Sequence, residues 1–327
     1  MTVYTVERPI ISPEEHPSVG RNIQGPALVE VPDWVPNRLG RYYLYFADHK
    51  RDHIRLAWAE ALTGPWHIYE PGALRLADSH FPTAPQHGTD AEVATMRERL
   101  LAAGIVMDGL EHSLAEEFST PHIASPDVLI DAEQRRFILY YHGLERFGVQ
   151  RTRVATSSDG LNFTAEAPLL GLTYWRGFAW NGACYALTMP GQFYRSDSWL
   201  GPFERGPRLF DGNMRHAAVR VAEDQLEVFW TQVGDTPERI YRCEIDLRPD
   251  WAAWRTSERV EVLRPERSWE GADLPLQPSV RSFAPRPVNQ LRDPALIEIN
   301  VGADAGLYLA YAVAGESGIG IARLHHN

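Results

Sequence analysis

The sequence of 327 residues lacks the features of several specialised protein classes. It has only two cysteines, Cys184 and Cys243, which stand apart in strand-like contexts and are expected to be buried free thiols. No stretch approaches 18 consecutive apolar residues, so no membrane-spanning helix is expected. Because the N-terminus has neither the basic start nor the apolar segment of a signal peptide, a cytoplasmic location is expected.

Positive charge is scarce as well, and it is not clustered. The chain has 32 Lys and Arg against 43 Asp and Glu, which gives a formal net charge of −11. Nucleic acids and anionic membranes are therefore not expected as partners. The motifs of glycine-rich phosphate loops, of G-x-S-x-G hydrolases and of CxxC sites are missing too. This balance fits a protein with a neutral or small ligand, and it leaves the oligomeric state open.

Tryptophan and tyrosine are plentiful instead, with ten Trp and thirteen Tyr. Strand-rich structure favours aromatic residues, which is the simpler interpretation for any one of them. Aromatic rings also stack on the apolar faces of sugars. A carbohydrate-binding surface is therefore the alternative interpretation, and a small carbohydrate is the expected substrate.

The chain repeats one pattern of short strands five times. Each repeat holds three or four strand-like segments separated by Gly, Pro and Asp turns at hairpin spacing. Five such units predict an all-β fold, a five-bladed β-propeller, formed as a single domain by residues 1–327. The fifth unit lacks an outer strand. The N-terminal segment YTVERPI could supply it and so remove an exposed sheet edge.

Residues 77–121 interrupt the repeats between the first and second units. The stretch TDAEVATMRERLLAAGIVMDGL lacks strand alternation and is rich in helix formers. Thr89 and Asp90 are the predicted N-cap, with Glu92 nearby. We predict a helical insertion, or lid, at this place. The proline-rich segment 265–290 is predicted to be a long ordered connection before the last blade.

The propeller geometry converts the sequence into a set of candidate site residues at one mouth of the central channel. The innermost strands all run in the same direction, so their starts meet at one face, to which the loops joining second and third strands also return. Candidate catalytic residues there are Asp127, Asp293, Asp48, His216, Glu145 and Glu316. Candidate substrate-binding residues are His49, His122, His142, Trp175, Arg176, Trp180, Arg215 and Arg292.

Asp127 and Asp293 rank first among these candidates. They occupy similar places in SPDVLI of the second unit and RDPALI of the fifth. Two carboxylates facing one pocket are what glycoside hydrolysis needs, because one protonates the leaving oxygen while the other activates water or attacks carbon. Nearby arginines would hold a carboxylate ionised. A single Asp after Pro, however, is more often a turn or capping residue.

The blade pattern, with YYLYFA, LTGPW, SPDV and RDPALI, resembles the five-bladed propeller glycoside hydrolases of family 43 and its relatives in families 32, 62, 68 and 117. The resemblance covers nearly the whole chain as architecture, although the individual motifs are short. It implies hydrolysis of a small furanose-type or modified glycoside. In that group a general-base Asp lies on the first blade, a pKa-tuning Asp on the second, a Glu acid on the third and often a central His on the fourth.

Carried over residue by residue, the resemblance is incomplete. Asp127 matches the second-blade Asp and His216 matches the central His. The first blade has Gly25 before Pro26 where Asp-Pro is expected, and the third has Arg176 in place of a Glu-Gly-Pro motif. Two of the three expected catalytic carboxylates are therefore missing from their usual blades.

Two explanations follow from this departure. In the first, the catalytic set has migrated, with Asp293 or Asp48 as base and a His, Glu145 or Glu316 as acid; family 117 enzymes offer a precedent for a histidine acid. In the second, the site no longer hydrolyses glycosides and is a non-catalytic carbohydrate-binding site, or that of a sugar lyase or isomerase. No cofactor is required by either. A structural divalent cation in the channel, held by His216, is compatible with the resemblance.

Overall fold

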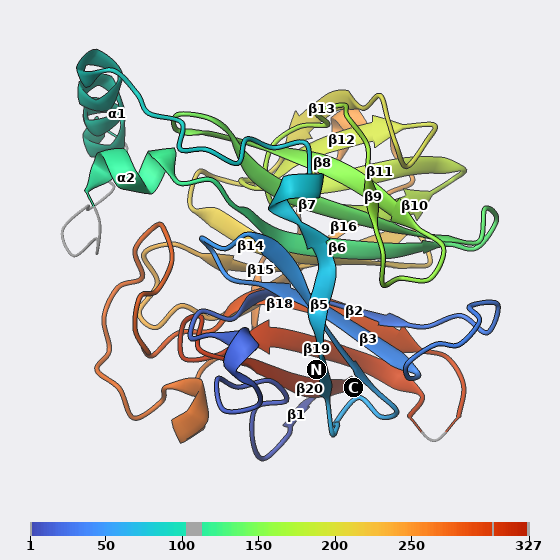
Figure 1. Ribbon diagram of the computed structural model, residues 1–327. Coiled ribbons are helices and arrows are strands. Elements are labelled where there is room, and N and C mark those ends of the chain that lie inside the picture. The colour runs from blue at the N-terminus through green and yellow to red at the C-terminus, as the bar shows by residue number, and fades with distance from the viewer. Residues whose placement is uncertain (1, 103–112, 303, 326–327) are drawn as a thin grey trace.

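The computed structural model describes residues 2–102, 113–302 and 304–325, which form five four-stranded antiparallel sheets (Figure 1). The first two sheets consist of β2 (Gln24–Glu30), β3 (Tyr42–Ala47), β4 (His53–Ala59) and β5 (His67–Arg75), then β6 (Ile123–Asp131), β7 (Arg136–Arg146), β8 (Val149–Ser157) and β9 (Thr164–Ala165). The next two consist of β10 (Arg176–Trp180), β11 (Ala183–Thr188), β12 (Gln192–Ser196) and β13 (Glu204–Arg208), then β14 (Met214–Ala222), β15 (Gln225–Gln232), β16 (Ile240–Asp246) and β17 (Val260–Leu263).

The fifth sheet closes the ring. It joins β18 (Arg292–Ile299), β19 (Gly306–Ala312) and β20 (Ile319–His325) to the N-terminal strand β1 (Thr2–Thr5), which pairs antiparallel with β20. The inner strands contact one another around the ring in the order β2, β6, β10, β14, β18 and back to β2. The predicted five-bladed propeller is therefore confirmed, and so is its closure by the N-terminal segment. The two chain ends lie side by side in Figure 1.

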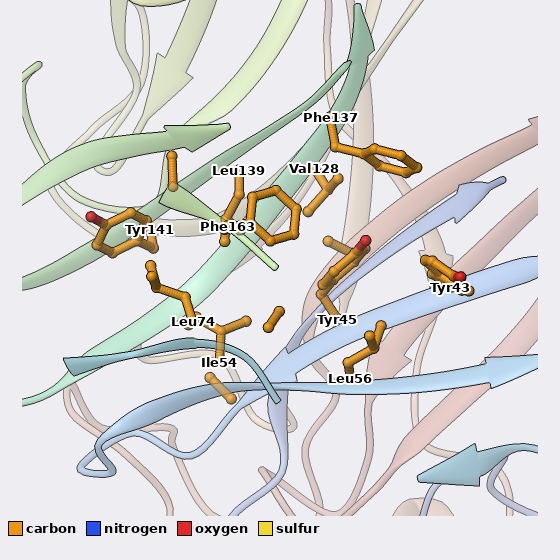
Figure 2. Packing of buried hydrophobic residues seen from close by; sticks show 14 of the residues in the cluster. Tyr43, Tyr45, Ile54, Leu56, Leu74, Val128, Phe137, Leu139, Tyr141 and Phe163 are labelled. Atoms are coloured by element: carbon orange, nitrogen blue, oxygen red, sulfur yellow. The ribbon is translucent and has the colours of Figure 1, made fainter. Parts of the chain in front are cut away.

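The hydrophobic core lies between neighbouring blades. All six residues of β3 are buried because each face of this strand packs against another sheet. Figure 2 shows Tyr43 and Tyr45 of the first blade facing Phe137 and Leu139 of the second. The Tyr45 hydroxyl donates to the Gly160 carbonyl at 2.7 Å, which satisfies its buried oxygen. Many of the abundant aromatic residues thus fill spaces between sheets, and both cysteines are buried free thiols as expected.

The predicted insertion contains two helices, α1 (Asp90–Ala102) and α2 (Leu114–Ser119), between the first and second blades. The predicted cap of α1 is confirmed: Thr89 Oγ1 accepts from the backbone N–H of Glu92, and the Glu92 carboxylate accepts from that of Thr89. The rest of the predicted helix falls on residues 103–112, which lie outside the described residues. Helix α2 was not predicted as a separate element, although Ser113 and Glu116 form a capping box at its start.

Shorter elements complete the fold. They are the 3-10 helices η1 (Pro17–Val19), η2 (Leu76–Asp78), η3 (Trp251–Ala253) and η4 (Ser268–Glu270). The last lies in the segment 265–290, which is ordered as predicted. Its buried Glu270 accepts from the Tyr311 hydroxyl at 2.7 Å. In Figure 1 this orange segment and the helices α1 and α2 lie on the same side of the sheets. No helix in the described ranges is long and apolar enough to cross a membrane.

Candidate functional site at the channel mouth

A cavity of about 350 Å³ opens where the inner strands begin. Tyr174, Arg215 and His216 line it from the strand starts, and His49 and Met189 from loops between second and third strands. Helices α1 and α2 contribute Leu100, Leu114, Glu117 and Phe118, and the segment before β18 contributes Arg281 and Ser282. The structure therefore brings together three of the predicted residues, His49, Arg215 and His216. We call this space the mouth cavity.

A backbone bulge at the start of the inner strands determines which side chains reach this end. Pairing with the second strand shifts register around Gly25, Ser125, His216 and Asp293. Each of these four residues has a left-handed φ, between 45° and 63°. A bulge bends its strand and re-aims the side chain it carries. His216 and Asp293 are thus held in a conformation uncommon for residues other than glycine.

The bulges also correct the expected equivalence of Asp127 with Asp293. After each bulge, regular pairing resumes at Ala27, Asp127 and Ala295. Asp127 is therefore equivalent to Ala295, while Asp293 is equivalent to Ser125 and Gly25, each of which precedes a proline. The sequence match of Asp127 with Asp293 was therefore displaced by two residues. Asp293, and not Asp127, occupies the place of the Asp-Pro motif.

Asp293 is buried with both carboxylate oxygens free of hydrogen-bond partners among the described residues. Its Oδ1 lies 3.4 Å from Nε2 of His216. Burial, followed by the charge of Glu316, raises the pKa of Asp293 to about 7, against the opposing influence of three arginines. An acid with such a pKa is available both to give and to take a proton near neutral pH.

His216 is a neutral imidazole with a defined tautomer. The Nε of Arg215 donates to His216 Nδ1 at 3.3 Å, and a guanidinium has no acceptor. Nδ1 is therefore unprotonated, and the ring proton is on Nε2, which faces Asp293. Burial, with the positive charges of Arg215 and Arg292, holds the pKa of His216 well below its usual value.

A network of buried ion pairs lies beneath the mouth. Arg292 contacts Glu316 at 2.8 Å and Glu238 at 3.4 Å, and Glu238 also contacts Arg215 at 3.2 Å. Glu316 accepts a further hydrogen bond of 2.6 Å from Asn22 Nδ2. These contacts compensate the buried charges of both glutamates. The predicted residues Arg292 and Glu316 are therefore near the site, where they pair with each other and do not line the mouth cavity.

A row of rings runs around the mouth. Neighbouring ring centroids are 4.8 to 6.4 Å apart along the series Phe283, His49, His122, His142, Tyr174, and 4.9 Å apart between Tyr174 and His216. Several imidazole nitrogens in it are buried without partners in the described part of the chain: His49 Nδ1, His122 Nε2 and both of His142. Burial keeps these rings neutral and lowers the pKa of His122 to about 3. Buried polar atoms of this kind are normally satisfied, so they point to a polar ligand.

Asp127 lies away from the mouth cavity. It lines a smaller cavity of about 80 Å³ inside the channel, to which all five inner strands contribute. Its carboxylate accepts from the Gly177 N–H at 2.8 Å and lies 3.7 Å from Arg176. No hydrogen bond or ion pair joins it to Asp293 within the described ranges. Asp293 does not line this smaller cavity, so the predicted pairing of the two carboxylates in one pocket stays a prediction.

Three predicted binding residues are also misplaced. Trp175 is buried in the core between the second and third blades, where it stacks on Tyr194. Trp180 ends β10 and pairs with Ala183 across the hairpin at the opposite end of the blade. Arg176 lines the inner cavity, donates to three backbone carbonyls and does not line the mouth cavity. The third inner strand begins at Arg176, and the residues before it that line the mouth cavity are Thr173 and Tyr174.

Two predicted acids are engaged in ion pairs elsewhere. Asp48 contacts Arg55 and Arg51, each at 3.3 Å. Glu145 contacts Arg153 at 3.4 Å. Neither lines the mouth cavity. Both acids lie near a connection between second and third strands, where candidates were expected. Each is paired there with arginines of the same loop or of the following strand.

Sequence reasoning missed Tyr174, Arg281 and Phe283 as members of the site, and did not rank Glu238 among the candidates. Tyr174 directly precedes the predicted strand start, so one residue of imprecision concealed it. Arg281 and Phe283 come from the long segment before β18, whose path over the mouth no local pattern indicates. Glu238 lies at the end of a loop between second and third strands, a position at which candidates were sought.

The site does not fit a divalent cation. Within the described ranges no group of three or more His, Cys, Asp or Glu side chains is arranged to hold a metal ion. The pKa of His216 is lowered by the charges of Arg215, Arg292 and Arg176, which would equally repel a cation. The predicted cation at His216 therefore lacks support from the residues around it.

Comparison with known proteins gives one relative in sequence and many in fold. No protein-family model matches the chain. The uncharacterized protein R118 of Acanthamoeba polyphaga mimivirus is 31% identical over 331 residues, which cover 93% of this chain and 83% of that protein.

The solved structures that resemble this chain are propellers. A family 43 β-xylosidase/α-arabinofuranosidase from a compost microbial metagenome, bound to xylotriose, superposes with a TM-score of 0.57 at 10% identity, over 100% of this chain and 96% of that one. A glycoside hydrolase family 130 protein, in work on hydrolases targeting β-1,2 mannosidic linkages in Candida mannan, gives 0.61 at 12% identity, over 98% and 93%. The family 43 enzyme of Xanthomonas citri with xylotriose gives 0.57 at 12%, over 99% and 90%. At sequence identities this low, the structural resemblance establishes a common fold only.

Proposed function

This chain belongs to the same family as the mimivirus protein R118, and from its propeller fold and its channel mouth we propose that it is a glycosidase acting on a small furanose-type or modified sugar. The observation that carries this proposal is Asp293. It is a buried carboxyl group with unpartnered oxygens and a pKa near 7, next to a neutral His216 that lines the mouth cavity. Solved propellers of similar fold bind xylotriose, which supports a sugar as ligand.

In the proposed chemistry, Asp293 and Glu316 take different roles because their environments differ. Glu316 is paired with Arg292 and accepts from Asn22, so it is the carboxyl group with direct partners. Asp293 has no such partner and is the group held near its protonation midpoint. Paired acids whose environments differ in this way take different roles in glycoside hydrolysis. Asp293 then protonates the leaving oxygen, and Glu316 stabilises or activates the attacking group.

His216 is the proposed positioning residue for Asp293. Its Nε2 lies 3.4 Å from Oδ1 of Asp293 without a hydrogen bond, while Nδ1 accepts from Arg215. When Asp293 gives up its proton, the Nε2–H can stabilise the carboxylate that forms. The unpartnered nitrogens of His49 and His142 are suited to sugar hydroxyls, which both donate and accept hydrogen bonds.

The experiment compares the parent protein with Asp293→Asn and Asp127→Asn on a panel of aryl furanosides, xylosides, mannosides and uronides. Loss of a general acid costs roughly 100-fold to 10,000-fold in turnover. We expect Asp293→Asn to fall in that range. Asp127→Asn is the matched control because it makes the same change at the inner cavity, and it should keep turnover within about tenfold of the parent.

Two results would contradict the proposal. Equal losses in both variants would remove the distinction between the mouth and the inner cavity. A parent protein that turns over no glycoside but binds sugars by calorimetry would favour a non-catalytic carbohydrate-binding propeller.

A further inference from the structure

Arginines outnumber carboxylates among the side chains that line the mouth cavity, although Arg215 is also paired with the buried Glu238 outside that lining. Glu117 is the acidic side chain that lines it, and this carboxylate contacts Lys50 at 3.2 Å and accepts from the Ser282 hydroxyl at 3.0 Å. Three arginines line the same space: Arg151, Arg215 and Arg281. Glu117 is thus already paired with Lys50. The excess of arginines at this cavity contrasts with the net charge of −11 of the whole chain.

Arg281 and Arg151 have no ion-pair partner within the described ranges. Arg281 donates to the Gly212 carbonyl at 2.6 Å, and its Nε is buried without a partner. Arg151 donates to the carbonyl of Gln150 at 2.8 Å. A backbone carbonyl carries no full charge, so neither guanidinium group has a carboxylate in direct contact, although both are partly exposed and the charge of Glu238 favours Arg281. A guanidinium group without a contacting carboxylate can donate to an anionic ligand.

Arg215 adds a third donor beside Arg281. It is 2% exposed, and its NH1 donates to the carbonyl of Val280, the residue before Arg281, at 3.0 Å. Its NH2 is buried and lacks a partner among the described residues. Burial and the nearby charge of Arg292 lower the pKa of Arg215, an electrostatic cost that an anion at the mouth would offset.

We propose that Arg215 and Arg281 bind an oxyanion group on the sugar ligand, a carboxylate, phosphate or sulfate, with Arg151 at the rim. Guanidinium groups match such anions because they present several donors in a fixed plane. This inference rests on the proposed function for the identity of the ligand as a sugar, and it specifies the class: an anionic sugar. Phe118, Leu114 and Met189 line the same cavity and would contact its apolar portion.

The test uses pairs of sugars that differ in one anionic group: glucuronate and glucose, galacturonate and galactose, and ribose 5-phosphate and ribose. Dissociation constants are measured by calorimetry on the full chain. In at least one pair the anionic sugar should bind at least about tenfold more tightly, since one charge-assisted hydrogen bond can contribute this much. Arg281→Gln should reduce that preference to about threefold or less.

Arg264→Gln is the matched control, because Arg264 is paired with the surface residue Glu261 away from the mouth. It should leave the preference unchanged. Thermal unfolding of each variant checks that it is folded. Should Arg281→Gln fail to fold, Arg151→Gln provides the same test at the rim and should reduce the preference about threefold.

The outcomes separate this inference from the proposed function. No pair with an anionic preference, or a preference that survives both arginine substitutions, overturns the inference while leaving hydrolysis of neutral sugars intact. Inorganic phosphate binding as tightly as the anionic sugars, and competing with them, shows that the arginines hold a free oxyanion and overturns the assignment to a sugar substituent. Anionic monosaccharides that bind through Arg281, together with no turnover of any aryl glycoside in the panel, refute the glycosidase proposal and support the anion site.

Discussion

At the scale of single residues, the chemistry of the site depends on one carboxyl group in an unusual place. Asp293 has a left-handed φ of 46° and is buried beside Glu316, with its two oxygens unpartnered in the described part of the chain. A residue chosen only for stability would not combine backbone strain with an uncompensated polar group. Such combinations are typical of functional sites.

This environment predicts a pH-dependent stability. The pKa of Asp293 rises from 3.8 to about 7 on folding, so between these values the folded chain binds more protons than the unfolded chain. Stability is therefore fully present below about pH 4 and falls as pH rises toward 7, by on the order of 4 kcal/mol. Asp293→Asn should remove this loss and unfold in urea at a higher concentration than the parent at pH 8, but not at pH 4. The control variant Asp33→Asn, at an exposed position, should show the same loss of stability with pH as the parent.

A parent protein whose loss of stability between pH 4 and pH 8 is unchanged in Asp293→Asn would contradict this assignment.

Gly25 explains why the first-blade acid of the resembling enzymes is missing here. A Cβ at this position would lie 2.9 Å from Ser125 Cα, and φ is +63°. Gly25→Asp should therefore lower the free energy of unfolding by about 1–3 kcal/mol more than Gly182→Asp. Gly182 has a similar φ of +78° and nothing within 4 Å of its Cβ position. Equal losses in urea denaturation would show that strain alone, and not the approach of the second blade, keeps glycine at position 25.

At the scale of elements, the bulged starts of the inner strands explain both the success and the failure of sequence reasoning. The strand starts were predicted correctly because turn residues and apolar runs mark them. The match between SPDVLI and RDPALI was made on Asp, whereas the backbone aligns Pro126 with Pro294. Because a bulge inserts residues into one strand, only the pairing register reveals the shift. Aligning the prolines would have matched Asp293 with Ser125 and Asp127 with Ala295.

Helix α2 is held over the mouth by contacts from two distant segments. Lys50 of the first blade and Ser282 of the segment before β18 both contact the Glu117 carboxylate. Glu117→Gln should weaken this attachment and raise hydrogen exchange in residues 114–119, while leaving β7 unchanged. Glu98→Gln, on exposed α1, is the control. Unchanged exchange in α2 would mean that its apolar contacts with the cavity suffice to hold it. No local sequence pattern could have predicted this attachment, since its partners are far apart in the chain.

At the scale of the whole molecule, ring closure depends on the four residues of the N-terminal strand β1. Strand β1 pairs with β20 from Thr2 to Thr5 and covers an edge that would otherwise expose unpaired backbone groups. Removal of residues 1–5 should lower the midpoint of thermal unfolding by several degrees and increase association in solution. Tyr4→Ala is the control, because this side chain is 60% exposed and the backbone pairing is retained. A truncated chain that stays monomeric with an unchanged midpoint, measured by light scattering and calorimetry, would contradict this role.

The whole molecule also shows why the fold could be predicted more fully than the site. Five repeated strand patterns indicate the propeller even when each pattern is weak, because the repeats support one another. The mouth is assembled once, from different residues in each blade and from the insertions, so no repeat predicts it. Arg281 and Glu117 illustrate this, since both reach the mouth from outside the repeats.

The most direct measurement of the central claim is a crystal structure of the protein with sugars soaked in, using neutral and anionic monosaccharides together. The account predicts a sugar ring in the mouth cavity, with a hydroxyl or ring oxygen within hydrogen-bond distance of Asp293 or His216 and an anionic group at Arg281. A sugar bound on an outer strand or in the inner cavity at Asp127, with the mouth cavity occupied only by water, would contradict it.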